Sequence, residues 1–348
     1  FWNCLKDGEL ILREEVSKFE DNLAHYTGTV YGIGVGSGTD ALFLSLKALG
    51  IKEGDEVITV AHTFIASIQC IVHCGATPIL VDVKENELMD VDQLENVVTP
   101  RTKAIIPVHF HGKVCEMNKI LDFAEKYNLK VIEDAAQALG SKFKGKMAGS
   151  FGNLGCFSFN TPKLLGGFGD GGGIVTNDKE LADKLYLLRN HWNMAQTSVR
   201  MADFPTPEFV EWGWKSRLDN VQAALLNVKW NYFDQLLERR KELARMYCES
   251  LQDLQLILPK YTEEDVIQEF IIQVANRKAF KEFINQKGIE VLVREEIPNH
   301  KLKNLGWDHF NLPVTETISQ YAVRLPAYPE LYDSEVNYII ASIREFYG

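Results

Sequence analysis

The sequence predicts an α/β protein in which a large three-layer domain with a mostly parallel sheet precedes a smaller α+β domain. Apolar segments of strand length alternate with segments of helical periodicity from about residue 29 to residue 177. This alternation is typical of βαβ units, whose strands are covered by helices on both faces. A long helical stretch follows, and short strand and helix patterns return near the end. We therefore expect a large domain over residues 1–235 and a small domain over residues 236–348.

The strands of the large domain are expected where apolar and β-branched residues form short runs that end at turn-forming residues. In chain order these runs are residues 29–35, 56–60, 78–83, 103–110, 130–134, 156–159 and 173–176. Helices are expected where apolar residues recur every three or four positions. These segments are residues 40–49, 63–73, 91–98, 117–127 and 179–189.

An irregular segment rich in polar and aromatic residues, 190–216, separates these units from the rest of the chain. A loop of this length in a compact domain tends to have a function. Residues 217–249 carry Leu, Ala and Val at helical spacing and are predicted to form a spine between the two domains. In the small domain we expect strands over 270–274 and 290–293 and helices over 278–287 and 334–346.

Composition argues against several classes of function. The 37 basic and 48 acidic residues give a net charge of −11, without a basic run, so neither nucleic acid nor an anionic membrane is an expected partner. No apolar run approaches the roughly 20 residues of a membrane span. The six cysteines are widely spread and form no metal-ligand pattern. We therefore expect reduced thiols, a cytoplasmic protein and no metal site.

The most informative residue is Lys163, which lies in a glycine-rich loop after the predicted strand 156–159. The predicted strand 130–134 ends in a carboxylate, Asp134. Ligands of such sheets bind at the carboxyl ends of the strands, so the two side chains are expected to converge. A lysine and an aspartate are what a pyridoxal phosphate site needs. The lysine forms a Schiff base, and the aspartate keeps the ring nitrogen protonated.

The glycine-rich segment 32–41 connects a predicted strand to a predicted helix and has three interpretations. Its backbone amides and the start of the helix suit a phosphate group. It can also be a plain tight turn. Gly36, Gly38 and Ala41 match the G-x-G-x-x-A form of the dinucleotide fingerprint. The hydroxyls of Ser37 and Thr39 favour a single phosphate monoester.

Three further residues are candidates with ordinary alternatives. Gln137 follows Asp134 by one short turn and can reach the same crevice as a neutral hydrogen-bonding partner. Phe64 starts a predicted helix, where an aromatic ring either stacks on a flat cofactor or belongs to the core. His300 lies between predicted elements of the small domain. It either closes over a substrate or is merely an exposed loop residue.

Taken together, these segments resemble the DegT/DnrJ/EryC1/StrS family of sugar aminotransferases, which have the aspartate aminotransferase fold (fold type I). The resemblance runs from about residue 10 to the C-terminus. It is carried by residues 36–42, 62–67, 133–137, the spacing from Ser158 to Lys163, and residues 169–176 and 217–224. It implies the PLP-dependent transferase fold.

The resemblance implies a role for each matching position. Lys163 would be the catalytic residue, forming the Schiff base with pyridoxal phosphate and then moving the proton between substrate and cofactor. Asp134 would pair with the pyridine nitrogen, Gln137 would lie near the ring hydroxyl, and Phe64 would stack on the ring. The phosphate would be held by Ser37, Gly38, Thr39 and Ser158. His300 matches a histidine that lies near the sugar nucleotide in similar proteins.

The resemblance also implies a homodimer in which the loop over 190–217 reaches the partner's site. Many relatives carry Gly-x-Asn-x-Arg there, whereas this chain has Gly213, Lys215 and Arg217. Lys215 is expected to bind the partner's phosphate as a point charge. Residues 293–297 also depart from the usual His-Tyr-Pro pattern, since they carry an arginine and two acids. That departure indicates an unusual sugar.

The expected activity is transfer of an amino group from glutamate to a keto group of a nucleotide-linked (dTDP-, UDP- or GDP-) deoxysugar. The run Gly169-Asp170-Gly171-Gly172 and residues 217–224 are nearer to relatives that act at C3 than to those that act at C4. The alternatives are a 4-keto sugar or a keto-cyclitol as acceptor, a non-catalytic pyridoxal phosphate-binding regulator, and an oxidoreductase that binds NAD on the loop around Gly36.

Overall fold

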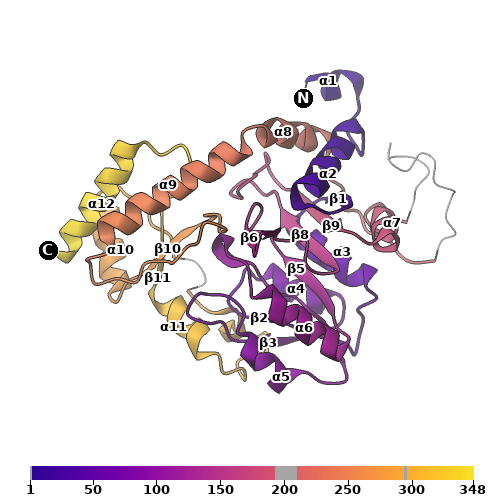
Figure 1. The fold of residues 1–348 in the computed structure, drawn as a ribbon, viewed down its shortest axis with the longest axis horizontal. Helices are drawn as coiled ribbons and strands as arrows, with labels where there is room; N and C mark the ends of the chain where they lie inside the picture. The colour runs from indigo at the N-terminus through magenta and orange to yellow at the C-terminus, as the bar shows by residue number, and fades with distance from the viewer. Residues whose placement is uncertain (1, 193–209, 294–295) are drawn as a thin grey trace.

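The structure is a computed structural model that describes residues 2–192, 210–293 and 296–348. Two lobes lie side by side (Figure 1). The larger lobe is built around one seven-stranded sheet, and the smaller lobe lies at the C-terminal end around a two-stranded sheet. None of the described helices is long and apolar enough to cross a membrane.

The central sheet confirms the predicted α/β class. Its strand order is β1-β9-β8-β5-β4-β2-β3. The strands from β8 to β3 run parallel, and β9 is antiparallel to both of its neighbours. The strand bounds are β1 (Tyr31–Val35), β2 (Glu56–Val60), β3 (Thr77–Val81), β4 (Thr102–Ile105), β5 (Lys130–Asp134), β8 (Leu154–Ser158) and β9 (Gly172–Thr176). Because β9 returns directly after β8, the loop between them stays at one edge of the sheet.

Helices cover both faces of the sheet, which gives the three layers. One core packs the sheet against α2 (Glu14–Thr27), α6 (Met117–Tyr127) and α8 (Asn220–Trp230). The other packs it against α3 (Gly38–Ala48), α4 (Ala66–His73) and α7 (Lys179–Leu188). Every residue of β2 and β9 is buried, as expected for strands covered on two sides. The short elements of this lobe are α1 (Trp2–Asp7), η1 (Val91–Gln93), α5 (Leu94–Val97), η2 (Phe110–Gly112), β6 (Lys142–Phe143) and β7 (Lys146–Met147).

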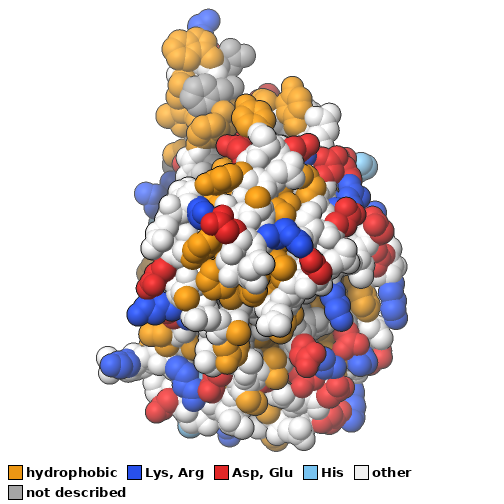
Figure 2. Space-filling model, turned by 90° about the vertical axis from the view of Figure 1, so that its left-hand side faces the viewer, with side chains coloured by type: hydrophobic (Ala, Val, Ile, Leu, Met, Phe, Trp, Pro, Cys, Tyr) orange, Lys and Arg blue, Asp and Glu red, His pale blue; other side chains and the backbone are white. Residues whose placement is uncertain are grey.

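The small lobe has its own core under an antiparallel pair, β10 (Phe270–Gln273) and β11 (Ala322–Leu325). Its helices are α10 (Arg277–Gln286), α11 (Pro313–Tyr321) and α12 (Asp333–Tyr347), with the short η4 (Asn299–Lys301). On the face that this lobe presents in Figure 2, acidic and basic side chains are interspersed among the described residues.

The long helix α9 (Phe233–Leu251) belongs to both lobes (Figure 1). Its first turn contributes Phe233 to the core of the large lobe. Further along, Leu243 and Tyr247 are part of the small lobe's core. The domain boundary expected after residue 235 lies inside this helix.

Several elements differ from the sequence expectation. The helical stretch 217–249 is two helices, α8 and α9, separated at Asn231 and Tyr232. Residues 290–293 form no strand, because the strand that pairs with β10 is β11. Among these four residues only Leu292 makes a bridge, to Arg324 of β11. Neither β11 nor the neighbouring α11 was predicted. The strand expected over 103–110 ends at Ile105, shortly before Pro107, which has no amide hydrogen for a ladder.

Candidate active site

A cavity of ≈ 330 Å³ opens at the edge of the sheet where the parallel strands end. The loops that follow β1, β2, β4, β5 and β8 line it, and two residues next to β10 close it from the small lobe. The predicted residues found in its lining are Ser37, Gly38, Thr39, Phe64, Asp134, Gln137, Ser158 and Lys163. The convergence expected from the strand ends is therefore present.

The start of α3 forms one wall of the cavity. Ser37 caps this helix, since its Oγ accepts a hydrogen bond from the amide of Asp40 at 3.1 Å. A Cβ on Gly38 would lie 2.8 Å from the Cβ of Ser158, so only glycine lets the helix and β8 approach this closely. Backbone amides, the positive end of the helix and the Ser158 hydroxyl meet here. They form a cradle suited to a phosphate group.

Asp134 is a buried carboxylate at the end of β5. Its Oδ2 accepts a hydrogen bond from the Ser67 hydroxyl at 2.7 Å, and its Oδ1 accepts one from the amide of Ala136 at 3.2 Å. Thr63 extends the network, because its hydroxyl lies 2.7 Å from that of Ser67. These contacts fix the carboxylate at the cavity wall, where it can pair with a protonated ring nitrogen.

Lys163 lies on the loop between β8 and β9, and the small lobe holds this loop. The side chain of Gln268 accepts a hydrogen bond from the amide of Leu164 at 3.0 Å and donates one to the carbonyl of Pro162 at 2.9 Å. The buried side-chain amide of Gln268 thus binds the backbone on both sides of the lysine. Asn160 ties the loop to itself by donating to Asp170 at 2.7 Å.

Two further predicted residues lie in the cavity wall. Phe64 leaves 59% of its surface exposed in the cavity lining, so its ring is available for stacking. Gln137 is buried, and its Oε1 accepts a hydrogen bond from the amide of His111 at 2.8 Å. This bond fixes the side chain of Gln137 at the cavity wall.

Two other predicted residues do not line this cavity. His300 is fully buried, and its Nε2 lies 3.1 Å from a carboxylate oxygen of Glu316. Lys215 is exposed, and its backbone forms a β-bridge with the buried Asn190. The central part of the loop predicted to reach the partner, residues 193–209, lies outside the described residues, as do Arg294 and Glu295.

Sequence reasoning missed several residues of the lining. They are Ser67, Asn160, Asp170, Gln268 and Glu269. The first three fall within segments that carry the family resemblance. Gln268 and Glu269 come from a segment about a hundred positions beyond Lys163. Their only sequence signal is a pair of polar residues directly before an apolar strand.

A loop lysine, a strand-end carboxylate and a phosphate cradle share one cavity at the strand ends of this sheet. That combination is typical of a pyridoxal phosphate-dependent enzyme. A sequence profile described as the DegT/DnrJ/EryC1/StrS aminotransferase family matches residues 1–344. The chain belongs to this family.

Individual relatives agree with this assignment over nearly the whole chain. It is 40% identical over 346 residues to the dTDP-3-amino-3,6-dideoxy-alpha-D-galactopyranose transaminase of Aneurinibacillus thermoaerophilus, covering 98% of this chain and 93% of the relative. It is 37% identical over 353 residues to a pleiotropic regulatory protein of Geobacillus stearothermophilus, covering 99% and 92%. Other relatives include further nucleotide-sugar aminotransferases.

The solved structure of NtdA from Bacillus subtilis, which holds the cofactor PMP, superposes with a TM-score of 0.91. It is 31% identical in sequence, and the match covers 99% of this chain and 79% of NtdA. The fold and the family therefore identify a pyridoxal phosphate-dependent enzyme.

Proposed function

We propose that this enzyme transfers an amino group from glutamate to the 3-keto group of a nucleotide-linked deoxysugar and that it acts as a homodimer. The observation that carries the proposal is the single cavity that joins Lys163, Asp134 and the cradle between Gly38 and Ser158. The choice of C3 is supported by the relatives whose names specify a 3-amino or 3-oxo sugar.

The residues fit the cofactor. The cradle between α3 and Ser158 would bind its phosphate, and the exposed ring of Phe64 offers a stacking surface. The carboxylate of Asp134 would pair with its ring nitrogen. Gln137 has an amide nitrogen left to donate, because the one bond described for its side chain uses its oxygen. When bound, pyridoxal phosphate supplies an electron sink for the carbon that loses its proton.

The protein's own part in the reaction is binding and proton transfer. The Asp134 carboxylate, fixed by Ser67, favours the charged form of a ring nitrogen by direct pairing. With the cofactor bound, the Lys163 amine would move the proton from the reacting carbon of the amino donor to a carbon of the cofactor, and in the second half-reaction it would move a proton from that cofactor carbon to the acceptor carbon. The grip of Gln268 on the loop limits where that amine can move.

The dimer is supported by apolar surface close to Lys215. Trp212 and Trp214 are 84% and 51% exposed, and both lie shortly before Lys215 in sequence. Large aromatic side chains left in water usually mark a binding surface. We place the partner subunit there, so that Lys215 of one subunit supplements the phosphate cradle of the other.

The first test is the visible absorption spectrum of the purified holoenzyme before and after addition of glutamate. We expect the band of the lysine-bound cofactor to disappear and the amine form of the cofactor to appear. Lys163→Ala, loaded with the cofactor, is the matched control and is expected to lack this response. A band that glutamate leaves unchanged would exclude glutamate as the donor.

The second step of the test identifies the acceptor. The amine form is mixed with 3-keto and 4-keto sugars linked to dTDP or UDP, and return of the original band is followed. Faster return with a 3-keto sugar is expected. Preference for a 4-keto sugar would overturn the C3 assignment. If glutamate bleaches the band but neither class of sugar restores it, the acceptor belongs to another chemical class, such as a keto-cyclitol.

A further inference from the structure

Three buried side chains form a cluster behind the wall of the active-site cavity. His62 follows β2, Glu87 lies in the turn after β3, and His111 belongs to η2. Each offers one possible ligand atom, and these atoms all lie within 4.8 Å of one another. The three residues are at most 8% exposed. They are far apart in sequence, and only the shared edge of the sheet brings them together.

His62 has an unusual environment for a buried imidazole. Neither of its ring nitrogens has a hydrogen-bond partner in the described part of the chain. A buried polar atom without a partner costs about 1–3 kcal/mol, so such a group calls for a ligand, an ion or a water molecule.

His111 has the geometry of a metal-binding histidine. Its Nε2 lies 3.3 Å from a carboxylate oxygen of Glu87, and its Nδ1 lies 3.4 Å from one of Glu269. Ligands about 2.0–2.1 Å from a tetrahedral ion lie roughly 3.3 Å apart, so the first distance already matches one edge of such a site. A metal-bound histidine typically directs its other nitrogen to a carboxylate. Nδ1 of His111 faces Glu269, although the contact lacks the alignment of a hydrogen bond. Arg324 pairs with the second oxygen of Glu269 at 2.9 Å.

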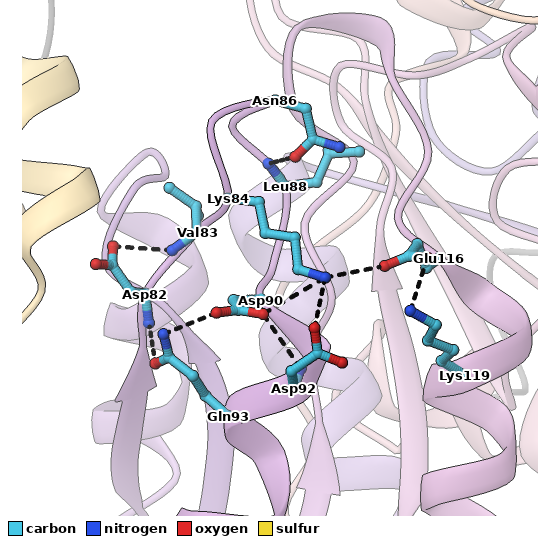
Figure 3. Close-up of polar contacts among 10 residues, drawn as sticks. All are labelled: Asp82, Val83, Lys84, Asn86, Leu88, Asp90, Asp92, Gln93, Glu116 and Lys119. Carbon is cyan, nitrogen blue, oxygen red and sulfur yellow. Dashed lines mark hydrogen bonds and ion pairs between the residues drawn. The ribbon is translucent and has the colours of Figure 1, made fainter.

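The backbone takes uncommon conformations to turn these side chains inward. Glu87 and His111 have φ angles of +70° and +54°, in the left-handed region that non-glycine residues seldom enter. The turn that carries Glu87 is held on both sides (Figure 3). Asn86 accepts a hydrogen bond from the amide of Leu88 at 3.2 Å, and Lys84 bonds Asp92 at 2.8 Å. Lys84 also pairs with Asp90 and Glu116.

The space beside the cluster has room for one more small ligand. A cavity of ≈ 10 Å³ is lined by the three residues together with Ser319, Arg324 and apolar side chains. This volume corresponds to about one water molecule. The hydroxyl of Ser319 has no hydrogen-bond partner among the described residues. It is therefore available to a water molecule that completes a four-coordinate ion.

We propose that His62, Glu87 and His111 bind one divalent zinc-type ion, with a water molecule as its fourth ligand. Two imidazoles and one carboxylate favour Zn²⁺ over Mg²⁺ or Ca²⁺, which prefer oxygen ligands. The ion ties together the loops after β2, β3 and β4. Since Phe64 follows His62 by two positions, the ion fixes the loop that carries the stacking ring. Its role is structural, because the reacting groups lie on the other side of this wall.

A protonated His111 bridging Glu87 and Glu269 would use the same contacts without a metal. Nδ1 of His111 makes no aligned hydrogen bond to Glu269 although it lies 3.4 Å away, and this geometry opposes that arrangement. That bridge would also leave both ring nitrogens of His62 without a hydrogen-bond partner among the residues that the structure describes. A metal ion would bind one ring nitrogen of each histidine, and geometry therefore favours it.

The test measures zinc retained by the holoenzyme after gel filtration, together with the melting temperature with and without added Zn²⁺. We expect one zinc per chain and a higher melting temperature. His62→Gln and His111→Asn are expected to weaken zinc binding at least tenfold. Asparagine tolerates the left-handed backbone at position 111. His73→Gln, an exposed histidine outside the cluster, is the matched control and should retain the metal.

Each outcome decides the proposal. Wild-type holoenzyme that retains no zinc, or cluster variants that bind it as well as the control, would overturn it. Loss of zinc in Cys248→Ser instead would mean thiol binding near the surface. Because misfolded variants would also lose metal, the visible band of the cofactor and its response to glutamate are recorded for each. Co²⁺ substitution of the wild type gives a second measurement, since a four-coordinate site with nitrogen and oxygen ligands has visible bands without a thiolate band.

Discussion

Asp134 shows how single contacts prepare a side chain for its partner. Both of its oxygens already accept a hydrogen bond, from the Ser67 hydroxyl at 2.7 Å and from the amide of Ala136 at 3.2 Å. These bonds fix the plane of the carboxylate at the end of β5. A carboxylate held in this way needs little rearrangement to pair with a cationic nitrogen, and this preorganisation is what the reaction requires.

Asp134→Asn tests the charge while preserving the shape. The amide oxygen can still accept a hydrogen bond from Ser67, but the negative charge next to the ring nitrogen is lost. A hydrogen bond to a charged group contributes about 1.5–3 kcal/mol, so we expect the rate of the glutamate half-reaction to fall about 10- to 100-fold. Single-turnover absorbance measures this rate. Ser67→Ala keeps the charge and should fall less; equal losses would argue against a role for the charge.

At the scale of residues, the sequence predicted the site where reactive side chains lie at or just after the ends of strands. Asp134 and Lys163 could be paired because each follows an apolar run and both runs end at the same edge of the sheet. Gln268 and Glu269 could not be found in this way, because their place depends on how the small lobe packs. The cluster of His62, Glu87 and His111 likewise forms where three loops meet, and no residue spacing in the sequence predicts it.

At the scale of elements, the loop between β8 and β9 is held by two similar clamps. Gln268 grips the backbone around Lys163. Gln222, on α8, grips Phe168 by accepting from its amide at 3.0 Å and donating to its carbonyl at 2.6 Å. The first clamp comes from the small lobe and the second from the large one. The position of the lysine therefore depends on the contact between the lobes.

Gln268→Met removes the first clamp with little change in volume. We expect kcat to fall about 10- to 100-fold through misplacement of the lysine, with the KM for glutamate nearly unchanged. The buried amide of Leu164 loses its partner, so the free energy of unfolding should also fall by about 1–3 kcal/mol. Gln222→Met removes the matching clamp farther from the lysine. Equal losses of kcat in the two variants would contradict a specific effect on Lys163.

The elements themselves were predictable to different degrees. Strands such as β2 and β5 are buried except for the first residue of β5 and contain short runs of β-branched apolar residues, and their predicted bounds were confirmed. The pairing of β10 with β11 joins residues about fifty positions apart, and the expectation placed a strand at 290–293 instead. Strand pairing across such a distance is decided by packing rather than by local sequence.

At the scale of the whole molecule, the proposed dimer implies that each active site contains residues from both subunits. In the proposed dimer, Lys163 acts within its own subunit and Lys215 acts on the partner's phosphate cradle. Lys163→Ala and Lys215→Ala would then damage different halves of each site. Mixed and reassociated, they should form dimers with one intact site, and activity should rise toward about one quarter of the wild-type value.

The assay is the glutamate-dependent amination rate, measured before and after the two variants are mixed under conditions that exchange subunits. Light scattering on the mixture verifies the dimer. Mixing each variant with itself is the control. Activity that stays at the mean of the two separate variants would show that Lys215 serves no site across the interface.

The helix α9 has a consequence for how heat denaturation is interpreted. The same rigid segment supplies Phe233 to one hydrophobic core and Leu243 and Tyr247 to the other. Water entering either core would therefore loosen a helix on which the other depends. The two lobes are expected to melt together in one cooperative transition. An ion bound only by loops of the large lobe would then also protect the small lobe from unfolding.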